Sequence, residues 1–217
     1  MEQCGRGAEA PSGEISLRRV VGFLIVLAGL AWPALASAQG ASQLIQQLGG
    51  QAIQVLQTTG GSLEQRERQF RAILSASFDM PGIARFVLGR HWQQANDEQR
   101  QDYVQLFTEY VLQTYSARLG GYSGETLAVT GERPAGQRDT VVTTRINRPS
   151  GAPVDASWRV RQGEDSRFRI IDVEVAGVSM TLTQRDEFSA VVQRYGIDGL
   201  NEVLRARTTK APATAAR

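Results

Sequence analysis

The sequence is nearly without cysteine. Its one cysteine, Cys4, lies ahead of an apolar run at residues 20–30, so it is not the residue that a lipoprotein leader would present for lipidation. Disulfide bonds are therefore excluded from the rest of the chain. The folded part must take its stability from the packing of side chains.

Long apolar runs are lacking too. The run at residues 20–30 has about eleven residues, short of the roughly 18–20 that span a bilayer. Arg18 and Arg19 precede it, and Ala36-Ser37-Ala38 follows it with the A-x-A pattern of a cleavage site. This order predicts a signal peptide over residues 1–38, cleaved before Gln39. An uncleaved membrane anchor is the alternative that the short run disfavours.

The chain also lacks a large excess of either charge, and it has little histidine. The formal net charge is +2, which gives no electrostatic case for nucleic acid as a partner. His91 is the only histidine, and no paired His/Cys spacing suggests a transition metal. The enzymatic alternative would depend on His91 or on a single carboxylate such as Asp172. His91 follows a predicted helix, where we expect a surface or capping role, and Asp172 alternates with valines on a predicted strand, so we expect no catalytic residue.

Apolar residues recur at helical spacing through the first half of the chain. They predict helices at residues 41–57, 62–78 and 81–88, and a longer one that begins after Asn96 and stops at Gly120-Gly121. Ser62 with Gln65, and Asn96 with Gln99, have the spacing of capping boxes. Two further helices are predicted near the C-terminus, at residues 188–195 and 198–204, separated by Gly196.

After Gly120-Gly121, and before the C-terminal helices, the spacing of apolar residues changes from helical to strictly alternating. Four strands are predicted at residues 126–131, 140–147, 154–162 and 167–175, with turn residues between them. Helices first and consecutive antiparallel strands second predict an α+β domain, in which helices pack on one face of a curved four-stranded antiparallel sheet. We expect this single domain over residues 39–207 and a disordered tail over residues 208–217, which is rich in alanine and threonine.

Two segments carry a resemblance to a known family. The first is residues 78–92, FDMPGIARFVLGRHW, in which an aspartate near a helix start precedes a VLG+xW stretch. The second is residues 171–180, IDVEVAGVSM, followed by Arg185, Phe188 and the Gly196-Ile197-Asp198 end. In this order and spacing they resemble the MlaC family, also called the toluene-tolerance auxiliary components. The related hopanoid-associated HpnM branch is the alternative within it.

The resemblance implies a cone similar to nuclear-transport-factor-like folds, with helices enclosing a lipid cavity against the sheet. It implies a periplasmic, non-enzymatic carrier of phospholipid, with bound lipid as cargo and no cofactor. The implied partners are an outer-membrane lipoprotein-porin complex of the MlaA type and an inner-membrane ABC transporter with an MlaD-type component. An adaptor that only bridges such complexes, without lipid, stays open.

A cavity for acyl chains should be lined by aliphatic and aromatic side chains, with the headgroup at its mouth. Arg85, Arg90 and Arg145 are candidates for a phosphate there. The predicted tail contacts are Phe86, Val87, Tyr103, Phe107, Tyr110 and Val111 from the helices, and Val142, Ile146, Trp158, Val173, Val175 and Val178 from the sheet.

Overall fold

The computed structural model describes residues 32–58, 62–116 and 122–209, with side chains from residue 40 onward. Contacts divide the chain into two units, Met1–Ala36 and Ser37–Arg217. Residues 1–31 of the predicted signal peptide and residues 210–217 of the predicted tail lie outside the described residues, so cleavage and a disordered end stay predictions. Residues 32–38 are helical, and residues 208 and 209 continue a helix and are not disordered as predicted. Everything below concerns the second unit.

The sheet has five strands in the order β1-β2-β3-β4-β5, and each neighbouring pair is antiparallel. The strands are β1 (Thr126–Pro134), β2 (Asp139–Asn147), β3 (Val154–Gln162), β4 (Phe168–Val175) and β5 (Val178–Ser179). The predicted count of four was wrong by one, because β5 is a two-residue strand too short to show an alternating pattern. The register shifts between Val129 and Gly131 and between Arg159 and Val160, and such irregularities bend a sheet.

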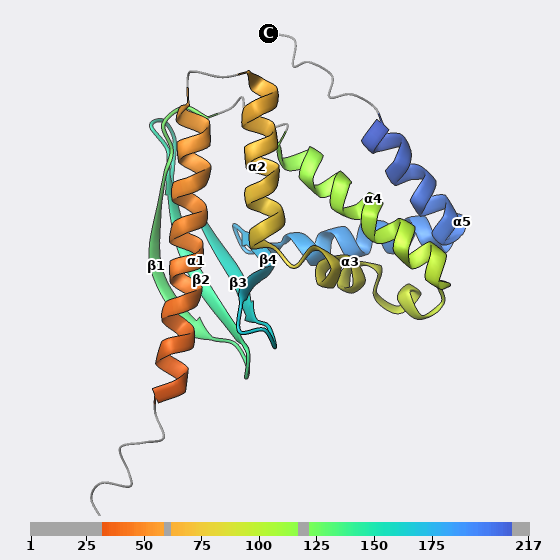
Figure 1. The fold of residues 1–217 in the computed structure, drawn as a ribbon, viewed down its shortest axis with the longest axis horizontal. Coiled ribbons are helices and arrows are strands. Elements are labelled where there is room, and N and C mark those ends of the chain that lie inside the picture. Colours follow the sequence, from red (N-terminus) through yellow and green to blue (C-terminus); the bar gives the residue numbers. More distant parts are fainter. Residues whose placement is uncertain (1–31, 59–61, 117–121, 210–217) are drawn as a thin grey trace, which may run out of the picture. The chain divides into compact units, whose positions relative to one another are not determined.

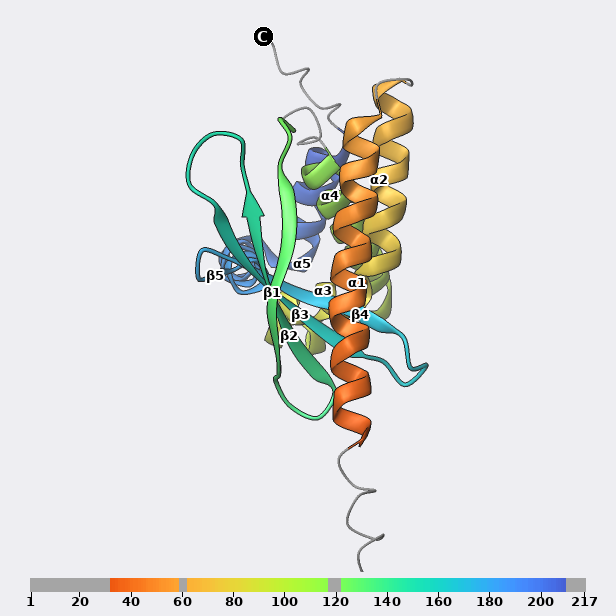
Figure 2. The ribbon, with the colours of Figure 1, turned by 90° about the vertical axis from the view of Figure 1, so that its left-hand side faces the viewer.

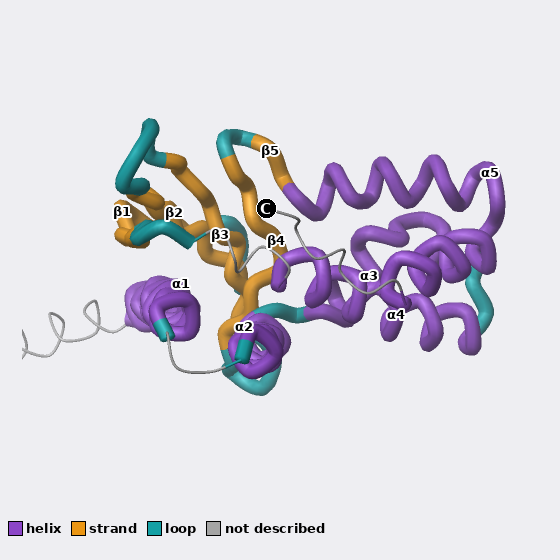
Figure 3. The backbone as a smooth tube through the Cα atoms, turned by 90° about the horizontal axis from the view of Figure 1, so that it is seen from above, coloured by secondary structure: helices purple, strands orange, loops and turns teal. Residues whose placement is uncertain are grey.

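One face of this sheet is covered by α1 (Trp32–Gln57) and α2 (Leu63–Ser77), as Figures 2 and 3 show. Ala41, Ile45 and Leu48 of α1 are buried in one cluster with sheet residues. A Cβ added to Gly49 would lie 3.2 Å from a methyl group of Leu127, so the missing side chain lets α1 approach β1 closely. The capping box predicted at Ser62 is confirmed by both of its hydrogen bonds.

The remaining helices gather beyond the β4 end of the sheet (Figures 1 and 3). They are α3 (Met80–Leu88), the 3-10 helix η1 (Gly89–Gln93), α4 (Asp97–Ser116) and α5 (Met180–Thr209). The capping box predicted at Asn96 opens α4. Gly196 interrupts α5 with φ 72° and ψ −177°, which confirms the predicted break between two helical segments.

Two aspartates connect the helices to the sheet. Asp79 caps α3 by accepting the Gly82 N–H, and its own N–H donates to the Ile170 carbonyl of β4 at 3.0 Å. Asp172 accepts hydrogen bonds from the Ser179 hydroxyl and the Thr181 N–H at the start of α5. The α+β class is therefore confirmed, with helix starts tied to β4. No helix in the described parts of the chain is both long and apolar enough to cross a bilayer.

Candidate functional site

The helical part of the predicted tail site forms one cluster. Val87, Tyr103 and Phe107 are buried together, and Tyr110 and Val111 pack against them. Four aromatic rings meet here, because the ring of Phe188 on α5 lies 6.4 Å from that of Tyr103, 6.2 Å from that of Phe107 and 6.1 Å from that of Tyr110. The structure thus brings five of the six predicted helical residues together around Phe188. We call these residues, together with Phe188 and the other buried side chains that pack with them, such as Leu200 and Leu204 of α5, the helical cluster.

Tyr103 carries the one polar atom of this aromatic group that is fully enclosed. Its hydroxyl donates to the Ala84 carbonyl of α3 at 3.1 Å, which satisfies a phenol that water does not reach. Burial raises the pKa of Tyr103 far above its ordinary value, so the ring stays neutral. The phenol is therefore a neutral, hydrogen-bonded group within an apolar cluster.

The sheet part of the predicted site lies on the face covered by α1 and α2. Val142 is fully buried there, and Trp158 and Val173 pack against its cluster. Ile146 and Val175 are half-buried, and the strand register places them on the same face. We call the apolar residues of this face and of α1 the sheet cluster. The indole N–H of Trp158 donates to the Thr144 hydroxyl at 2.9 Å, which fixes the ring on this face.

Two predicted tail residues are largely exposed, although Val178 lies opposite Val175 and so shares the covered face of the sheet. Phe86 is 44% exposed and Val178 is 51% exposed. Phe86 falls on the outer side of α3 because Ala84 and Val87 occupy the buried side, and Val178 lies on the short edge strand β5. Tail contact at these two positions stays a prediction that requires the ligand to reach the outer surface.

Phe78 connects the clusters, and the sequence prediction of the site left it out. Its side chain packs against the helical cluster, the sheet cluster and a third cluster of Leu74, Met80 and Leu112. Its backbone forms a parallel bridge with Ile170 of β4. A sequence signal existed, since an apolar residue directly before a helix cap often packs against the first turns of that helix.

The two residues of the enzymatic alternative have structural partners. The prediction for His91 was a surface or capping role, and the surface position was wrong because the side chain is buried, at 6% exposure. Its Nδ1 lies 3.1 Å from the side-chain oxygen of Gln94, and its Nε2 lies 3.4 Å from the Ser189 hydroxyl. Ser189 lies on α5, 98 residues further along the chain, so the local sequence around His91 could not predict this contact. Asp172 caps α5 as described above.

In the parts of the chain that the structure describes, no three His, Cys, Asp or Glu side chains come together as a metal site would need. The chemistry of the two clusters is therefore that of an apolar interior bordered by hydrogen-bonded helix starts.

A family model described as MlaC protein matches residues 46–206, a span that includes the helical cluster, Phe78 and the sheet cluster apart from Ala41, Leu44 and Ile45 of α1. The chain belongs to the MlaC family. A relative from Haemophilus influenzae, named intermembrane phospholipid transport system binding protein MlaC, is 27% identical over 117 residues. That alignment covers 52% of this chain and 55% of the relative, so the chain spans about half the length of this curated relative.

A solved structure shares the MlaC-family fold. It is the phospholipid-binding protein from Ralstonia solanacearum, determined in complex with a phospholipid. The superposition has a TM-score of 0.69 at 23% identity and covers 78% of this chain and 97% of the other. The likeness shows that the helices and the sheet are arranged as in that protein.

The arginines predicted to meet a phosphate lie in different settings in this MlaC-family chain. Arg145 is paired with Asp155, with Nε 2.8 Å from the carboxylate, on the face of the sheet away from α1. Arg85 borders a groove of about 320 Å³ next to α3, and Arg90 borders a neighbouring groove of about 270 Å³. Arg185 of α5 borders both grooves and was not among the predicted phosphate contacts.

Proposed function

We propose that this protein is a periplasmic phospholipid carrier. It would take lipid from one membrane complex and deliver it to another, between an MlaA-type complex at the outer membrane and an ABC transporter with an MlaD-type component at the inner membrane. The observation that carries the proposal is the match of the MlaC family model to residues 46–206. The name of the Haemophilus influenzae relative and the phospholipid bound to the Ralstonia solanacearum protein support it.

The acyl chains would lie between the helical cluster and the sheet cluster. Both clusters are apolar, and the residues at their border are only half-buried, so they have surface left to cover hydrocarbon. Half-buried residues of this kind are Tyr110 and Val111 on α4 and Trp158, Val173 and Val175 on the sheet, and they would contact the tails. Phe78, which packs against both clusters, would have to move aside when tails enter.

Burial of two acyl chains is strong enough to require a docking partner for release. At about 0.8 kcal/mol per methylene, roughly thirty methylenes contribute over 20 kcal/mol before the cost of ordering them. Escape of the lipid into water would then be too slow for transport. Transfer therefore has to occur while the carrier contacts a membrane complex, which supports a role between two such complexes.

Organic extraction followed by mass spectrometry tests the proposal. The protein is expressed from the full chain, collected from the periplasm and purified without detergent. We expect close to one diacyl phospholipid per protein. Hopanoid in its place would assign the protein to the HpnM-like function, and a protein that is empty and takes no lipid from liposomes would rule out carriage.

A further inference from the structure

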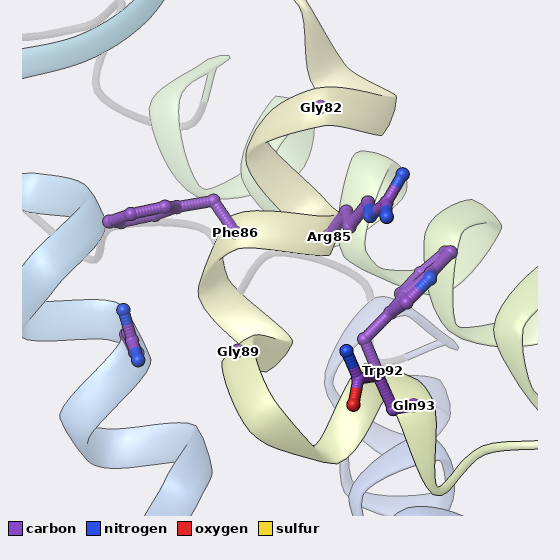
Figure 4. Close-up of a pocket in the computed structure, with 7 residues that line it drawn as sticks. Gly82, Arg85, Phe86, Gly89, Trp92 and Gln93 are labelled. Atoms are coloured by element: carbon purple, nitrogen blue, oxygen red, sulfur yellow. The ribbon is translucent and has the colours of Figure 1, made fainter.

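The groove beside Arg85 lies on the outer side of α3, opposite the buried side that joins the helical cluster. Its lining is unusual for a surface depression because it combines two glycines, two aromatic rings and two guanidinium groups, and Figure 4 shows all of these but Arg185 by label. The lining residues are Gly82, Arg85, Phe86, Gly89, Trp92, Gln93 and Arg185. No carboxylate is among them.

Both guanidinium groups are held by rings and not by acids. The guanidinium carbon of Arg85 lies 5.7 Å from the centre of the Trp92 ring, and that of Arg185 lies 5.4 Å from the centre of the Phe86 ring. Within the described residues, neither arginine forms an ion pair or a hydrogen bond. Stacking on a ring orients a guanidinium while leaving its N–H donors free for another acceptor.

The backbone is shaped to admit Arg185. Gly89 ends α3 with φ 58°, and a Cβ at this position would lie 2.9 Å from Nε of Arg185. A larger residue would therefore push Arg185 away from the groove. The nearby carboxylate of Asp79 accepts the Gly82 N–H, so it is engaged in capping α3.

A second arginine, Arg90, lies near Arg185 in the neighbouring groove. The neighbouring groove is lined by Arg90 and His91 as well as Arg185, with Asp186 as its only acidic side chain. Phe86 and Leu182 are exposed next to these arginines, at 44% and 51%, and Leu182 shares a face of α5 with Arg185 because the two are three residues apart. Arginines without acidic partners among the described residues, next to exposed apolar side chains, suit contact with a surface whose outer layer carries anionic groups and whose inner layer is apolar.

We propose that this groove is a binding site for the phosphate of phospholipid headgroups at a bilayer surface, separate from the space where acyl chains of the cargo would lie. Arginine donors match phosphate oxygens in a bidentate geometry, and the ring of Phe86 would enter the interfacial region between headgroups. The inference does not depend on lipid carriage, because it concerns the outer side of α3.

The test uses two probes on protein expressed from the full chain. Inorganic phosphate is titrated while the amide signals of Gly82 and Gly89 and the indole N–H signal of Trp92 are followed by NMR. Sedimentation measures binding to vesicles of phosphatidylglycerol and of phosphatidylcholine. We expect the wild-type protein to prefer phosphatidylglycerol vesicles, and Arg85→Gln/Arg185→Gln to bind them about ten- to thirtyfold more weakly.

Two controls separate the site from charge and from folding. Arg133→Gln/Arg194→Gln removes the same charge from exposed positions outside the groove and should bind nearly as the wild type does. Arg85→Lys/Arg185→Lys keeps the charge and should retain part of the affinity. Circular dichroism must show that all variants are folded.

Each outcome decides the question. Shifts of the three NMR signals with phosphate, and loss of vesicle binding only in the groove variant, support headgroup recognition. The same shifts without vesicle binding support a phosphate site whose source is the free ion. Equal vesicle binding by the groove variant and its charge-matched control overturns the proposal.

Discussion

At the scale of single residues, Asp139 is a buried carboxylate that is stabilised by two arginines. It is 7% exposed on the face of the sheet away from α1, and it accepts hydrogen bonds from Nε of Arg159 at 2.9 Å and from Nε of Arg161 at 2.7 Å. Burial alone would raise the pKa of the Asp139 carboxyl, but the hydrogen bonds and charges of Arg161 and Arg159 outweigh it and lower the pKa below its ordinary value.

This pair of contacts predicts a loss of stability in acid. Because the pKa of Asp139 is lower in the folded state than in the unfolded one, its contribution is complete above about pH 3.9 and disappears as the pH falls through the folded value. We expect Asp139→Asn to lower the free energy of unfolding by about 1–3 kcal/mol at pH 7. Urea titrations at pH 7 and pH 3 measure it, and the difference between variant and wild type should shrink at pH 3.

Asp155→Asn serves as the matched control. Asp155 also accepts from an arginine, Arg145, but its side chain is 68% exposed, so water screens the pair. The control should unfold almost as the wild type does. An equal loss in both variants would show that burial of Asp139 is not what makes its contacts matter.

At the scale of elements, α5 is a bent helix whose bend depends on one residue. Gly196 has a backbone conformation that only glycine adopts without strain, and a Cβ there would meet nothing within 4 Å. The strain of a substitution is thus purely conformational. The bend positions Leu200 and Leu204 of the second segment in the helical cluster.

Alanine substitution should therefore have opposite effects at two glycines. Gly196→Ala should lower the free energy of unfolding by about 1–3 kcal/mol through backbone strain. Gly50→Ala, in the middle of α1 and equally free of neighbours, should raise it by about 0.5–1 kcal/mol by stiffening the unfolded chain. Thermal unfolding followed by circular dichroism reports both signs, and a stabilised Gly196→Ala would contradict the strained bend.

Element prediction succeeded where the signal was local. The caps at Ser62 and Asn96 and the alternation of β2 and β3 are properties of neighbouring residues, and all are confirmed. The start of α5 was missed by eight residues, since the segment from Met180 to Glu187 has few apolar residues. Its start is stabilised by Ser179 and by Asp172 of β4, a contact that requires the sheet.

At the scale of the whole molecule, the apolar site could be predicted only in halves. Ten of the twelve predicted tail residues are buried or half-buried in one of the two clusters, because helical and strand periodicity are local patterns. What joins the halves is tertiary: Phe78 packs against both clusters, and Arg185 meets Gly89 across almost one hundred residues of sequence. Periodicity contains no information about such pairs, so the sequence prediction left them out.

Two valines on opposite faces of the sheet test where the cargo lies. Val173 faces the sheet cluster, and Val141 faces away from it, and both are half-buried. A carboxylate among acyl chains is costly, so Val173→Asp should retain less than a tenth of the bound lipid, an effect of about 1.4 kcal/mol or more. Val141→Asp should retain most of it. Phosphate analysis of extracts from folded protein gives the ratio, and equal retention would place the tails elsewhere.

The bulge after Val129 has a consequence beyond bending the sheet. β1 ends the strand order, so its outer backbone is paired with no other strand of the described residues. The bulge breaks the regular spacing of its N–H and C=O groups, and Glu132, Arg133 and Pro134 follow it on the same strand. Charge, proline and broken spacing all oppose the addition of a strand from a second molecule. The open edge of β1 is in this way protected from pairing with the same edge of a second molecule, which is the contact from which fibres grow.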